Sequence, residues 1–322
     1  MQLSEIRALV QTDMAGVDEL ITNHLHPEIE LINQLGHYII NSGGKRIRPL
    51  LVLLSAKAFG YQGKHHITLA AIVEFIHTAT LLHDDVVDVS MLRRGHETAN
   101  AIWGNQSSVL VGDYLFSRSF QMMVEVESLR VMEILANASN TIAAGEVRQL
   151  MNCHDPETTE ERYYQVISDK TAKLFSAATE LGALINGKSK EVVQSIANYG
   201  LYLGIAFQLT DDILDYTGDP NEMGKNIGDD LAEGKPTMPL IHALKNTDDA
   251  TQKIIRDAII EGSIEKLPII QDAIKSSGAI EYTYQQAKNY VDKALSCLSV
   301  LPDSTYKNAL AALAELSINR CV

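Results

Sequence analysis

Cysteine is scarce in this chain of 322 residues, which has only Cys153, Cys297 and Cys321. Three scattered cysteines are too few for a disulfide framework or a zinc site, and they fit a reducing cytoplasm. No uncharged apolar run reaches the ~18 residues that span a bilayer. The first residues do not combine a basic segment with an apolar core, so we expect no signal peptide. These absences predict a cytoplasmic protein without a transmembrane segment.

Positive charge is in deficit. The chain has 27 lysines and arginines against 41 aspartates and glutamates, a net charge of -14. This acidic excess argues against a general nucleic-acid binder. An acidic protein that binds an anionic substrate must gather its cations locally, so clusters of basic residues become informative.

No linker divides the sequence. It has no stretch rich in proline, glycine and serine, and no repeat of solenoid period. With 46% hydrophobic residues, the chain can bury a large core. Length alone would suggest two domains, but we expect a single domain over residues 1–322.

Two acidic motifs share one pattern. The segments 83–88 (His-Asp-Asp-Val-Val-Asp) and 208–215 (Gln-Leu-Thr-Asp-Asp-Ile-Leu-Asp) each place Asp-Asp-x-x-Asp at the end of an apolar, helical run. In a helix the first and last aspartates lie about 40° apart on one face, with the middle one at its edge. Carboxylates this close repel one another, and near the C-terminal end of a helix they also oppose its dipole. A cation offsets both costs, and hard oxygen ligands suit Mg²⁺.

A single motif of this kind is usually a solvated acidic turn. Two copies, both embedded in apolar sequence and followed by basic residues, instead predict two metal-carrying walls that face one cavity. The candidate metal ligands are Asp84, Asp85, Asp88, Asp211, Asp212 and Asp215.

Helical periodicity runs through nearly the whole chain and predicts an all-α fold. The expected helices cover residues 3–23, 28–41, 50–59, 67–89, 107–125, 128–152, 158–186 and 190–217. Residues 237–320 predict shorter helices broken by Pro268, Gly278 and Pro302. The helix over 67–89 is apolar almost all round and is therefore expected to be buried.

Basic residues gather beside glycines at two places. Residues 43–49 read Gly-Gly-Lys-Arg-Ile-Arg-Pro, and residues 93–95 read Arg-Arg-Gly directly after the first acidic motif. Flexible glycines beside cations favour an anion site, and arginine offers fixed forks for phosphate oxygens. An ordinary basic turn is the alternative for residues 43–49.

Polar residues interrupt several apolar helices. His77 lies about two turns before Asp84, where a role in substrate binding and a role as a satisfied core residue are equally open. Residues 145–149 and 168–173 predict a wetted cavity wall or, equally, solvent-facing stripes. The glycine-punctuated loop 224–236 carries Lys225 and Lys235, which are placed to close over phosphates; loops of this length are usually functional or disordered.

Taken together, these motifs resemble the trans-polyprenyl diphosphate synthases over about residues 14–317. The resemblance rests on the glycine-rich basic segment 43–49, the acidic motif 84–88 with 93–95, Lys170-Thr171, and the segments 207–215 and 224–230. It implies an isoprenoid-synthase fold, an antiparallel helix bundle around a deep central cavity, usually in a homodimer. The implied reaction is prenyl transfer, the repeated condensation of isopentenyl diphosphate onto an allylic diphosphate such as farnesyl diphosphate.

The resemblance also implies roles for individual residues. Two or three Mg²⁺ ions, held chiefly by Asp84, Asp88, Asp211 and Asp215, would grip the allylic diphosphate, with Asp85 and Asp212 as second choices. The same diphosphate would be bound by Arg93, Lys170, Thr171, Gln208, Lys225 and Lys235, of which Lys170 is also a candidate catalytic residue. Isopentenyl diphosphate would be bound by Lys45, Arg48, His77 and Arg94.

Product length is expected to depend on the turns before Asp84. Thr80 lies four residues back on the same helical face. In related synthases this position and Ala79 line the tunnel that holds the growing chain, and both residues are small here, which predicts a long product. Deeper residues that could close the tunnel, which the sequence does not rank, are Ile76, Val73, Met122 and Met123.

Three other functions compete with this interpretation. A terpene cyclase shares the fold and the first motif, but its second motif is generally an Asn/Ser/Glu arrangement. A non-catalytic regulatory subunit would be expected to have lost acidic or basic site residues, all of which are present here. A Ca²⁺-binding acidic scaffold would form no product from isopentenyl diphosphate. The sequence does not identify the allylic starter or the quinone that receives the chain.

Overall fold

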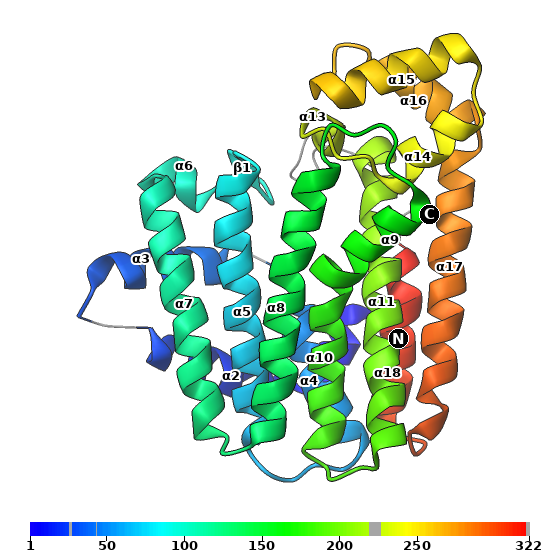
Figure 1. Cartoon of the computed structure of the whole chain (residues 1–322). Helices are drawn as coiled ribbons and strands as arrows, with labels where there is room; N and C mark the ends of the chain where they lie inside the picture. Colours follow the sequence, from blue (N-terminus) through cyan, green and yellow to red (C-terminus); the bar gives the residue numbers. More distant parts are fainter. Residues whose placement is uncertain (26–27, 43, 219–226, 320–322) are drawn as a thin grey trace. The chain divides into compact units, whose positions relative to one another are not determined.

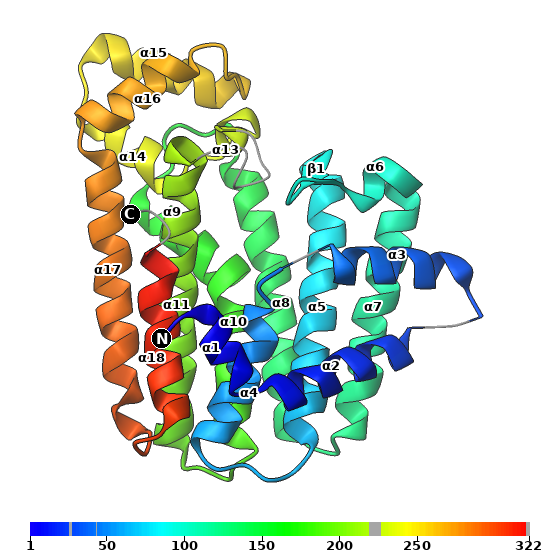
Figure 2. The same cartoon turned by 180° about the vertical axis from the view of Figure 1, so that it is seen from behind.

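The computed structural model describes residues 1–25, 28–42, 44–218 and 227–319 (Figures 1 and 2). The chain forms two compact units, each assembled from separate segments. Unit 1 comprises Met1–Ser139, Leu174–Gly200 and Cys297–Leu313, and unit 2 comprises Asn140–Lys173, Leu201–Ser296 and Ala314–Val322. The expectation of a single domain over 1–322 stays a prediction.

Unit 1 is built mainly from the first half of the chain. Its elements are α1 (Leu3–Ala8), α2 (Gln11–His24), α3 (Glu30–Asn41), α4 (Ile47–Ala58), α5 (His65–Val87), β1 (Leu92–Arg93), β2 (His96–Glu97), α6 (Ala99–Trp103), α7 (Asn105–Glu125), α10 (Lys173–Leu184) and η2 (Leu298–Val300). The long helices α8 (Leu129–Asn152), α11 (Lys190–Thr217) and α18 (Thr305–Ile318) contribute residues to both units.

Unit 2 gathers the rest. Its elements are α9 (Glu160–Ile167), the π-helical turn η1 (Ser168–Ala172), α13 (Asp229–Ala232), α14 (Met238–Lys245), α15 (Asp249–Glu261), α16 (Leu267–Ser276) and α17 (Ala279–Cys297). Helices α14, α15 and α16 pack on one another, as both views show. Their apolar core includes Tyr216, Leu240, Ile255 and Ile270.

The all-α prediction is confirmed, since the only strands among the described residues form the two-residue pair β1–β2. Helix α5 is central to unit 1 and packs against α2, α4 and α7. Its apolar side chains are buried on nearly every side, as its sequence predicts. In the described part of the chain it is the one helix long and apolar enough to cross a membrane, but 67% of that apolar window is buried inside the protein.

Two predicted helices are divided. The helix expected over 3–23 is α1 and α2, separated at Leu9 and Val10, where no glycine or proline marks the break. The helix expected over 158–186 is α9, η1 and α10 in direct succession. Hydrophobic periodicity does not distinguish a π turn from an α turn, which explains the second difference.

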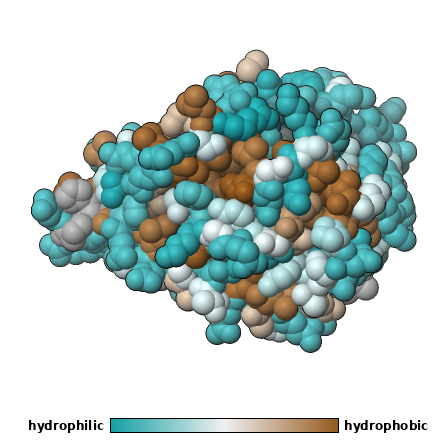
Figure 3. Space-filling model, turned by 90° about the horizontal axis from the view of Figure 1, so that it is seen from below, coloured by the Kyte–Doolittle hydropathy of each residue, from teal (hydrophilic) through white to brown (hydrophobic). Residues whose placement is uncertain are grey.

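Some apolar side chains remain at the surface. In α7, Leu110 and Val124 are exposed, and in the α8 part of unit 2 the exposed apolar residues are Val147, Leu150 and Met151. Figure 3 shows one face on which apolar and polar side chains alternate in patches. Single exposed apolar residues are ordinary, but three at positions i, i+3 and i+4 of one helix share a face and form a patch suited to contact.

Candidate active site

The first acidic motif forms the last turn of α5, in unit 1. Asp84 and Asp88 are partly exposed, while Asp85 is fully buried. The amide of Asp88 donates to the carbonyl of Asp84 at 2.8 Å, so the turn is still helical where the two outer carboxylates lie. The motif therefore presents two carboxylates on one face and turns the third inward.

Arg93 satisfies the buried Asp85. Its Nε and Nη2 donate to Asp85 Oδ1 at 2.9 and 2.7 Å. Among the described residues the other oxygen, Oδ2, has no hydrogen-bond partner. Arg93, predicted to bind the allylic diphosphate, is thus oriented by the middle aspartate of the motif.

A two-residue hairpin holds Arg93 and Arg94. Strands β1 and β2 pair antiparallel, and the turn residues Arg94 and Gly95 both have positive φ, 54° and 77°. Such turns favour Asn-Gly or Gly-Gly, so an arginine in the first position is held at a conformational cost. The Tyr38 hydroxyl of α3 donates to the carbonyl of Glu97 at 2.7 Å and joins the hairpin to that helix.

The basic segment at the start of α4 meets α5. Arg48 Nη1 donates to His77 Nε2 at 2.9 Å, and its guanidinium lies 4.6 Å from the centre of the Phe175 ring. Arg94 lies directly against Gly44, where an added Cβ would be 2.5 Å from Arg94 Nη1. Unit 1 therefore brings Arg48, His77 and Arg94 to one region, as the predicted isopentenyl diphosphate site requires. Lys45 is exposed beside them.

Arg46 has a structural role that the sequence did not indicate. Its backbone has φ 47° at the start of α4, and its guanidinium lies 3.6 Å from Glu74 and 3.5 Å from Asp18. Burial raises the pKa of Glu74, and the positive charge of Arg46 opposes that rise. The arginine thus offsets the cost of a buried acid on α5.

His77 is kept neutral by its surroundings. Burial lowers its pKa well below the ordinary value, and the charges of Arg48 and Arg94 lower it further. Arginine has no acceptor, so His77 Nε2 must carry a lone pair toward Arg48. His77 therefore orients Arg48, and a direct contact with isopentenyl diphosphate stays a prediction.

The second acidic motif lies near the C-terminal end of α11, in unit 2. Asp211 is partly exposed, whereas Asp212 and Asp215 are 1% and 8% exposed. Asp212 accepts hydrogen bonds from the Tyr163 hydroxyl at 2.5 Å and from Gln208 Nε2 at 2.9 Å. Burial raises the pKa of Asp212 to about 7, the charge of Asp230 adds to the rise, and the two hydrogen bonds oppose it.

The π turn η1 presents Lys170 and Thr171. Lys170 Nζ lies 2.7 Å from Glu146 Oε2 and 2.6 Å from Gln149 Oε1, both on α8. Thr171 Oγ1 donates to Gln208 Oε1 at 3.0 Å. Gly145 allows this approach, because an added Cβ would stand 2.7 Å from the backbone nitrogen of Lys170. Glu146 and Gln149 therefore support Lys170 from the neighbouring helix, while Val147 and Arg148 of the same segment are exposed.

The loop 224–236 contains two lysines that were predicted to bind phosphate, Lys225 and Lys235. Lys235 pairs with Glu233 just after α13. Lys225 lies outside the described residues, so its role stays a prediction.

The predicted chain-length residues are mostly core. Ile76, Ala79, Met122 and Met123 are 0–1% exposed, on the packed helices α5 and α7, and Val73 is also buried. Thr80 is partly exposed and donates to the carbonyl of His77 at 2.8 Å. Their role in setting product length stays a prediction.

Sequence reasoning missed Tyr163 and Phe175. A buried tyrosine hydroxyl usually finds a partner, and that general rule was the only signal for Tyr163. Its partner Asp212 lies 49 positions away, and nothing in the sequence joins the two. Nothing in the sequence indicated that Phe175 contacts Arg48.

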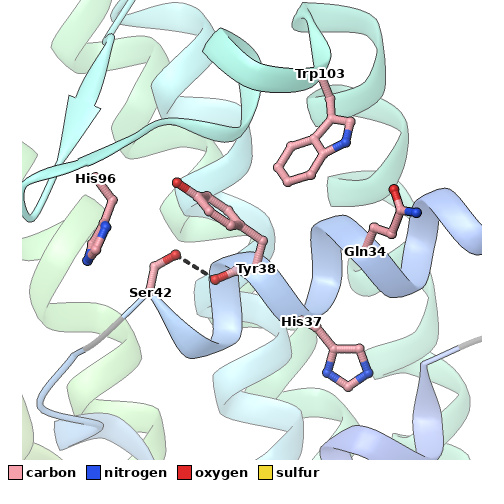
Figure 4. Close-up of a pocket in the computed structure, with 6 residues that line it drawn as sticks. All are labelled: Gln34, His37, Tyr38, Ser42, His96 and Trp103. Carbon is pink, nitrogen blue, oxygen red and sulfur yellow. Dashed lines mark hydrogen bonds between the residues drawn. The ribbon is translucent and has the colours of Figure 1, made fainter.

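A separate, open pocket lies in unit 1 and has a volume of about 520 Å³. Its lining residues are Gln34, His37, Tyr38, Ser42, His96 and Trp103 (Figure 4). The Tyr38 and Trp103 rings meet edge to face at 5.2 Å, and Ser42 Oγ donates to the Tyr38 carbonyl at 2.5 Å. None of the predicted site residues lines this pocket.

The acidic residues suit Mg²⁺ in its usual binding mode. The described residues contain no cluster of three His, Cys, Asp or Glu side chains that would form a complete metal site. Mg²⁺ keeps several waters and binds through one or two carboxylates together with substrate phosphates, so a complete protein cage is not needed. Asp84 and Asp88, beside the unpartnered Oδ2 of Asp85, fit that mode.

Known proteins match the chain over its whole length. The family model described as polyprenyl synthetase matches residues 29–275. Octaprenyl diphosphate synthase of Escherichia coli (strain K12) is 50% identical over 322 residues, with 99% of each chain covered.

Two solved structures are also similar. A polyprenyl synthase from Caulobacter crescentus CB15, complexed with calcium and isoprenyl diphosphate, has a TM-score of 0.96 at 44% identity, covering 100% of this chain and 98% of that one. A decaprenyl diphosphate synthase from Rhodobacter capsulatus has a TM-score of 0.95 at 46% identity, covering 100% of both chains.

Proposed function

The chain belongs to the polyprenyl synthetase family, and from this premise we propose that it is a Mg²⁺-dependent synthase of trans-octaprenyl diphosphate. The observation that carries the proposal is the 50% identity to an octaprenyl diphosphate synthase over the whole chain, together with two intact acidic motifs. Its substrates are isopentenyl diphosphate and an allylic diphosphate such as farnesyl diphosphate.

The allylic diphosphate is bound through metal and cations. Asp84, Asp88, Asp211 and Asp215 would hold two or three Mg²⁺ ions, and these would supply positive charge to offset that of the departing diphosphate. A solved relative complexed with calcium and isoprenyl diphosphate supports a divalent cation beside the diphosphate. The protein groups assigned to the same diphosphate are Arg93, Lys170, Thr171, Gln208, Lys225 and Lys235.

Isopentenyl diphosphate is bound by the arginine-rich region of unit 1. Arg48 is fixed between His77 and Phe175, and Arg94 is fixed by the hairpin turn. Lys45 adds a third cation, and neutral His77 keeps Arg48 in place. Positioned cations of this kind stabilise negative charge without reorganising during the reaction.

The reaction breaks an allylic C–O bond, after which the alkene of isopentenyl diphosphate attacks the allylic carbon and a proton is lost. Water must be kept from the cationic carbon, which it would otherwise capture. No side chain stands out as the base, so we assign the proton to the departing diphosphate. Repeating the cycle five times converts a three-unit starter into an eight-unit product.

We further propose a cytoplasmic homodimer that supplies the side chain of a quinone such as ubiquinone. The exposed apolar residues of α7 (Leu110 and Val124) and of α8 (Val147, Leu150 and Met151) support contact with a second copy. Small residues at Ala79 and Thr80 support a long product.

Product analysis tests the proposal directly. Purified protein is incubated with farnesyl diphosphate, isopentenyl diphosphate and Mg²⁺, and the dephosphorylated products are separated by chromatography beside standards of six to ten units. We expect eight units, and no product when a chelator replaces Mg²⁺. A product of nine or ten units would contradict the assigned length but not the reaction, and the absence of any polyprenyl product would contradict both.

A further inference from the structure

Four side chains of unit 2 form one hydrogen-bonded chain. Thr171 donates to Gln208 Oε1 at 3.0 Å, Gln208 Nε2 donates to Asp212 Oδ1 at 2.9 Å, and Tyr163 donates to Asp212 Oδ2 at 2.5 Å. Both oxygens of Asp212 are therefore engaged by protein donors. The carboxylate is 1% exposed and the tyrosine 4%, so this end of the chain is dry.

Helix geometry brings the four groups together. Gln208 and Asp212 are one turn apart on α11, which places them on the same face. Tyr163 and Thr171 are eight residues apart, and in a regular α-helix such residues lie about 80° apart around the axis. The turn η1 between them is π-helical and advances by a smaller angle per residue, which moves Thr171 toward the face of Tyr163.

Asp212 determines the orientation of the Gln208 amide. When ionised, the Asp212 carboxylate has only acceptors, so it accepts the Tyr163 proton and the Gln208 amide must turn its nitrogen toward Asp212. Its oxygen then faces Thr171 and receives the threonine proton. The second N–H of the Gln208 amide is not used within this network and can donate to a ligand.

We propose that Tyr163 and Asp212 are positioning residues that fix Gln208 and Thr171 for the allylic diphosphate, and that the second N–H of Gln208 is the donor offered to it. The inference rests on the proposed function, since it uses the assignment of Gln208 and Thr171 to that substrate. It assigns Asp212 a hydrogen-bonding role in place of metal binding, and it gives Tyr163 a role that its sequence position did not suggest.

A pair of adjacent tyrosines provides the experiment and its control. Tyr163→Phe removes the donor to Asp212. Tyr164→Phe removes a neighbouring buried hydroxyl that has no hydrogen-bond partner among the described residues. We expect Tyr163→Phe to raise the KM for farnesyl diphosphate about tenfold, the size typical of a lost hydrogen bond to a charged group, and to leave the KM for isopentenyl diphosphate unchanged. Tyr164→Phe should change neither value.

Asp212→Asn tests the amide orientation without removing volume. Its amide oxygen can accept from Tyr163, but its nitrogen then faces Gln208, whose amide must turn round. All four groups remain hydrogen-bonded, so we expect the variant to fold with an unchanged melting temperature. The KM for farnesyl diphosphate should again rise about tenfold, while the Mg²⁺ concentration for half-maximal rate, at saturating substrates, stays that of the wild type.

The outcomes separate the inference from the function on which it rests. Wild-type protein without polyprenyl product would overturn the proposed function. With active wild type, equal KM values for Tyr163→Phe and Tyr164→Phe would overturn the role of Tyr163. A higher Mg²⁺ requirement in Asp212→Asn than in the wild type would instead make Asp212 a metal ligand and overturn the orientation argument.

Discussion

The two acidic motifs have the same sequence pattern but different surroundings. In the first, the buried middle carboxylate of Asp85 is held by the guanidinium of Arg93. In the second, the buried middle carboxylate of Asp212 is held by the neutral donors Tyr163 and Gln208. Burial raises the pKa of Asp212 to about 7, the negative charge of Asp230 adds to that rise, and the two neutral donors oppose it.

The motif therefore determines which aspartates share a helix face, but it does not determine the surroundings of the buried middle aspartate. A spacing of four residues places the outer aspartates together in any helix. What holds the middle aspartate differs: Arg93 of a hairpin eight residues later holds Asp85, whereas Asp212 is held by Tyr163 of a different helix and by Gln208 one turn earlier on its own helix. A buried carboxylate is thus stabilised by a positive charge in unit 1 and by neutral hydrogen-bond donors in unit 2.

The largest effect is expected from the outer aspartates, where the two motifs should behave alike. Asp84→Ala or Asp211→Ala removes a hard ligand while the neighbouring carboxylates stay crowded, and turnover should fall about a hundred- to thousandfold at saturating Mg²⁺. Steady-state assays measure the loss, with Asp292→Ala, an exposed aspartate of α17, as the control. Near-normal turnover in either variant would contradict the shared role.

Arg48→Ala and Lys170→Ala should separate the two substrates. Each loses a charged contact of about 1.5–3 kcal/mol, so we expect KM to rise about ten- to hundredfold. Arg48→Ala should act chiefly on isopentenyl diphosphate and Lys170→Ala chiefly on the allylic substrate. Lys253→Ala on the exposed surface of α15 is the matched control. If each variant raised both KM values equally, the division into two diphosphate sites would be wrong.

The middle aspartates should differ in stability. Asp85→Asn leaves Arg93, whose side chain is 22% exposed, without its counter-charge, and we expect a loss of about 2 kcal/mol in the free energy of unfolding. Asp212→Asn keeps its hydrogen bonds and should change this free energy by less than about 1 kcal/mol. Urea titration of both variants beside the wild type measures the difference, and equal losses would remove the contrast between the two motifs.

The smallest effect concerns the pH dependence of unit 1. Burial holds the pKa of His77 in the folded protein well below its ordinary value of 6.5, so the unfolded chain binds more protons and stability falls as the pH drops below about 6.5. His77→Gln keeps an acceptor for Arg48 but does not titrate. Between pH 7.5 and 5.5 the wild type should therefore lose about 1 kcal/mol more than the variant. Since His66 and His242, whose pKa values are also lowered, are present in both proteins, they cancel. Identical losses would show that His77 is already charged in the folded protein.

Long amphipathic helices were predicted well from the sequence. The helix expected over 190–217 is α11 itself, and those over 67–89, 107–125 and 128–152 differ from α5, α7 and α8 by at most two residues at either end. Their length and periodicity determine them locally. The break at Leu9–Val10 and the π turn at 168–172 carry no local signal, because packing of the folded chain selects them.

The same limit applies to the site. The spacing of Asp84, Asp88, Asp211 and Asp215 and the basic clusters could be read from the sequence, since each lies within a few residues. Arg93 as the partner of Asp85, Tyr163 as a partner of Asp212, and Glu146 and Gln149 as the partners of Lys170 could not, because each is brought in by a different element. In the sequence Tyr163 and Tyr164 are equivalent, and only their surroundings give one a partner.

The hairpin turn at Arg94 and Gly95 has a consequence for directed evolution. Left-handed backbone at the first turn residue favours asparagine or glycine, so a screen for thermal tolerance alone should select Arg94→Asn or Arg94→Gly. The same change would remove the guanidinium that lies against Gly44 in the proposed isopentenyl diphosphate site. A library selected for heat resistance alone would thus lose Arg94 and, with it, activity. If a second selection, for product formation, restored arginine at position 94, this would show that the residue is kept for function although it costs stability.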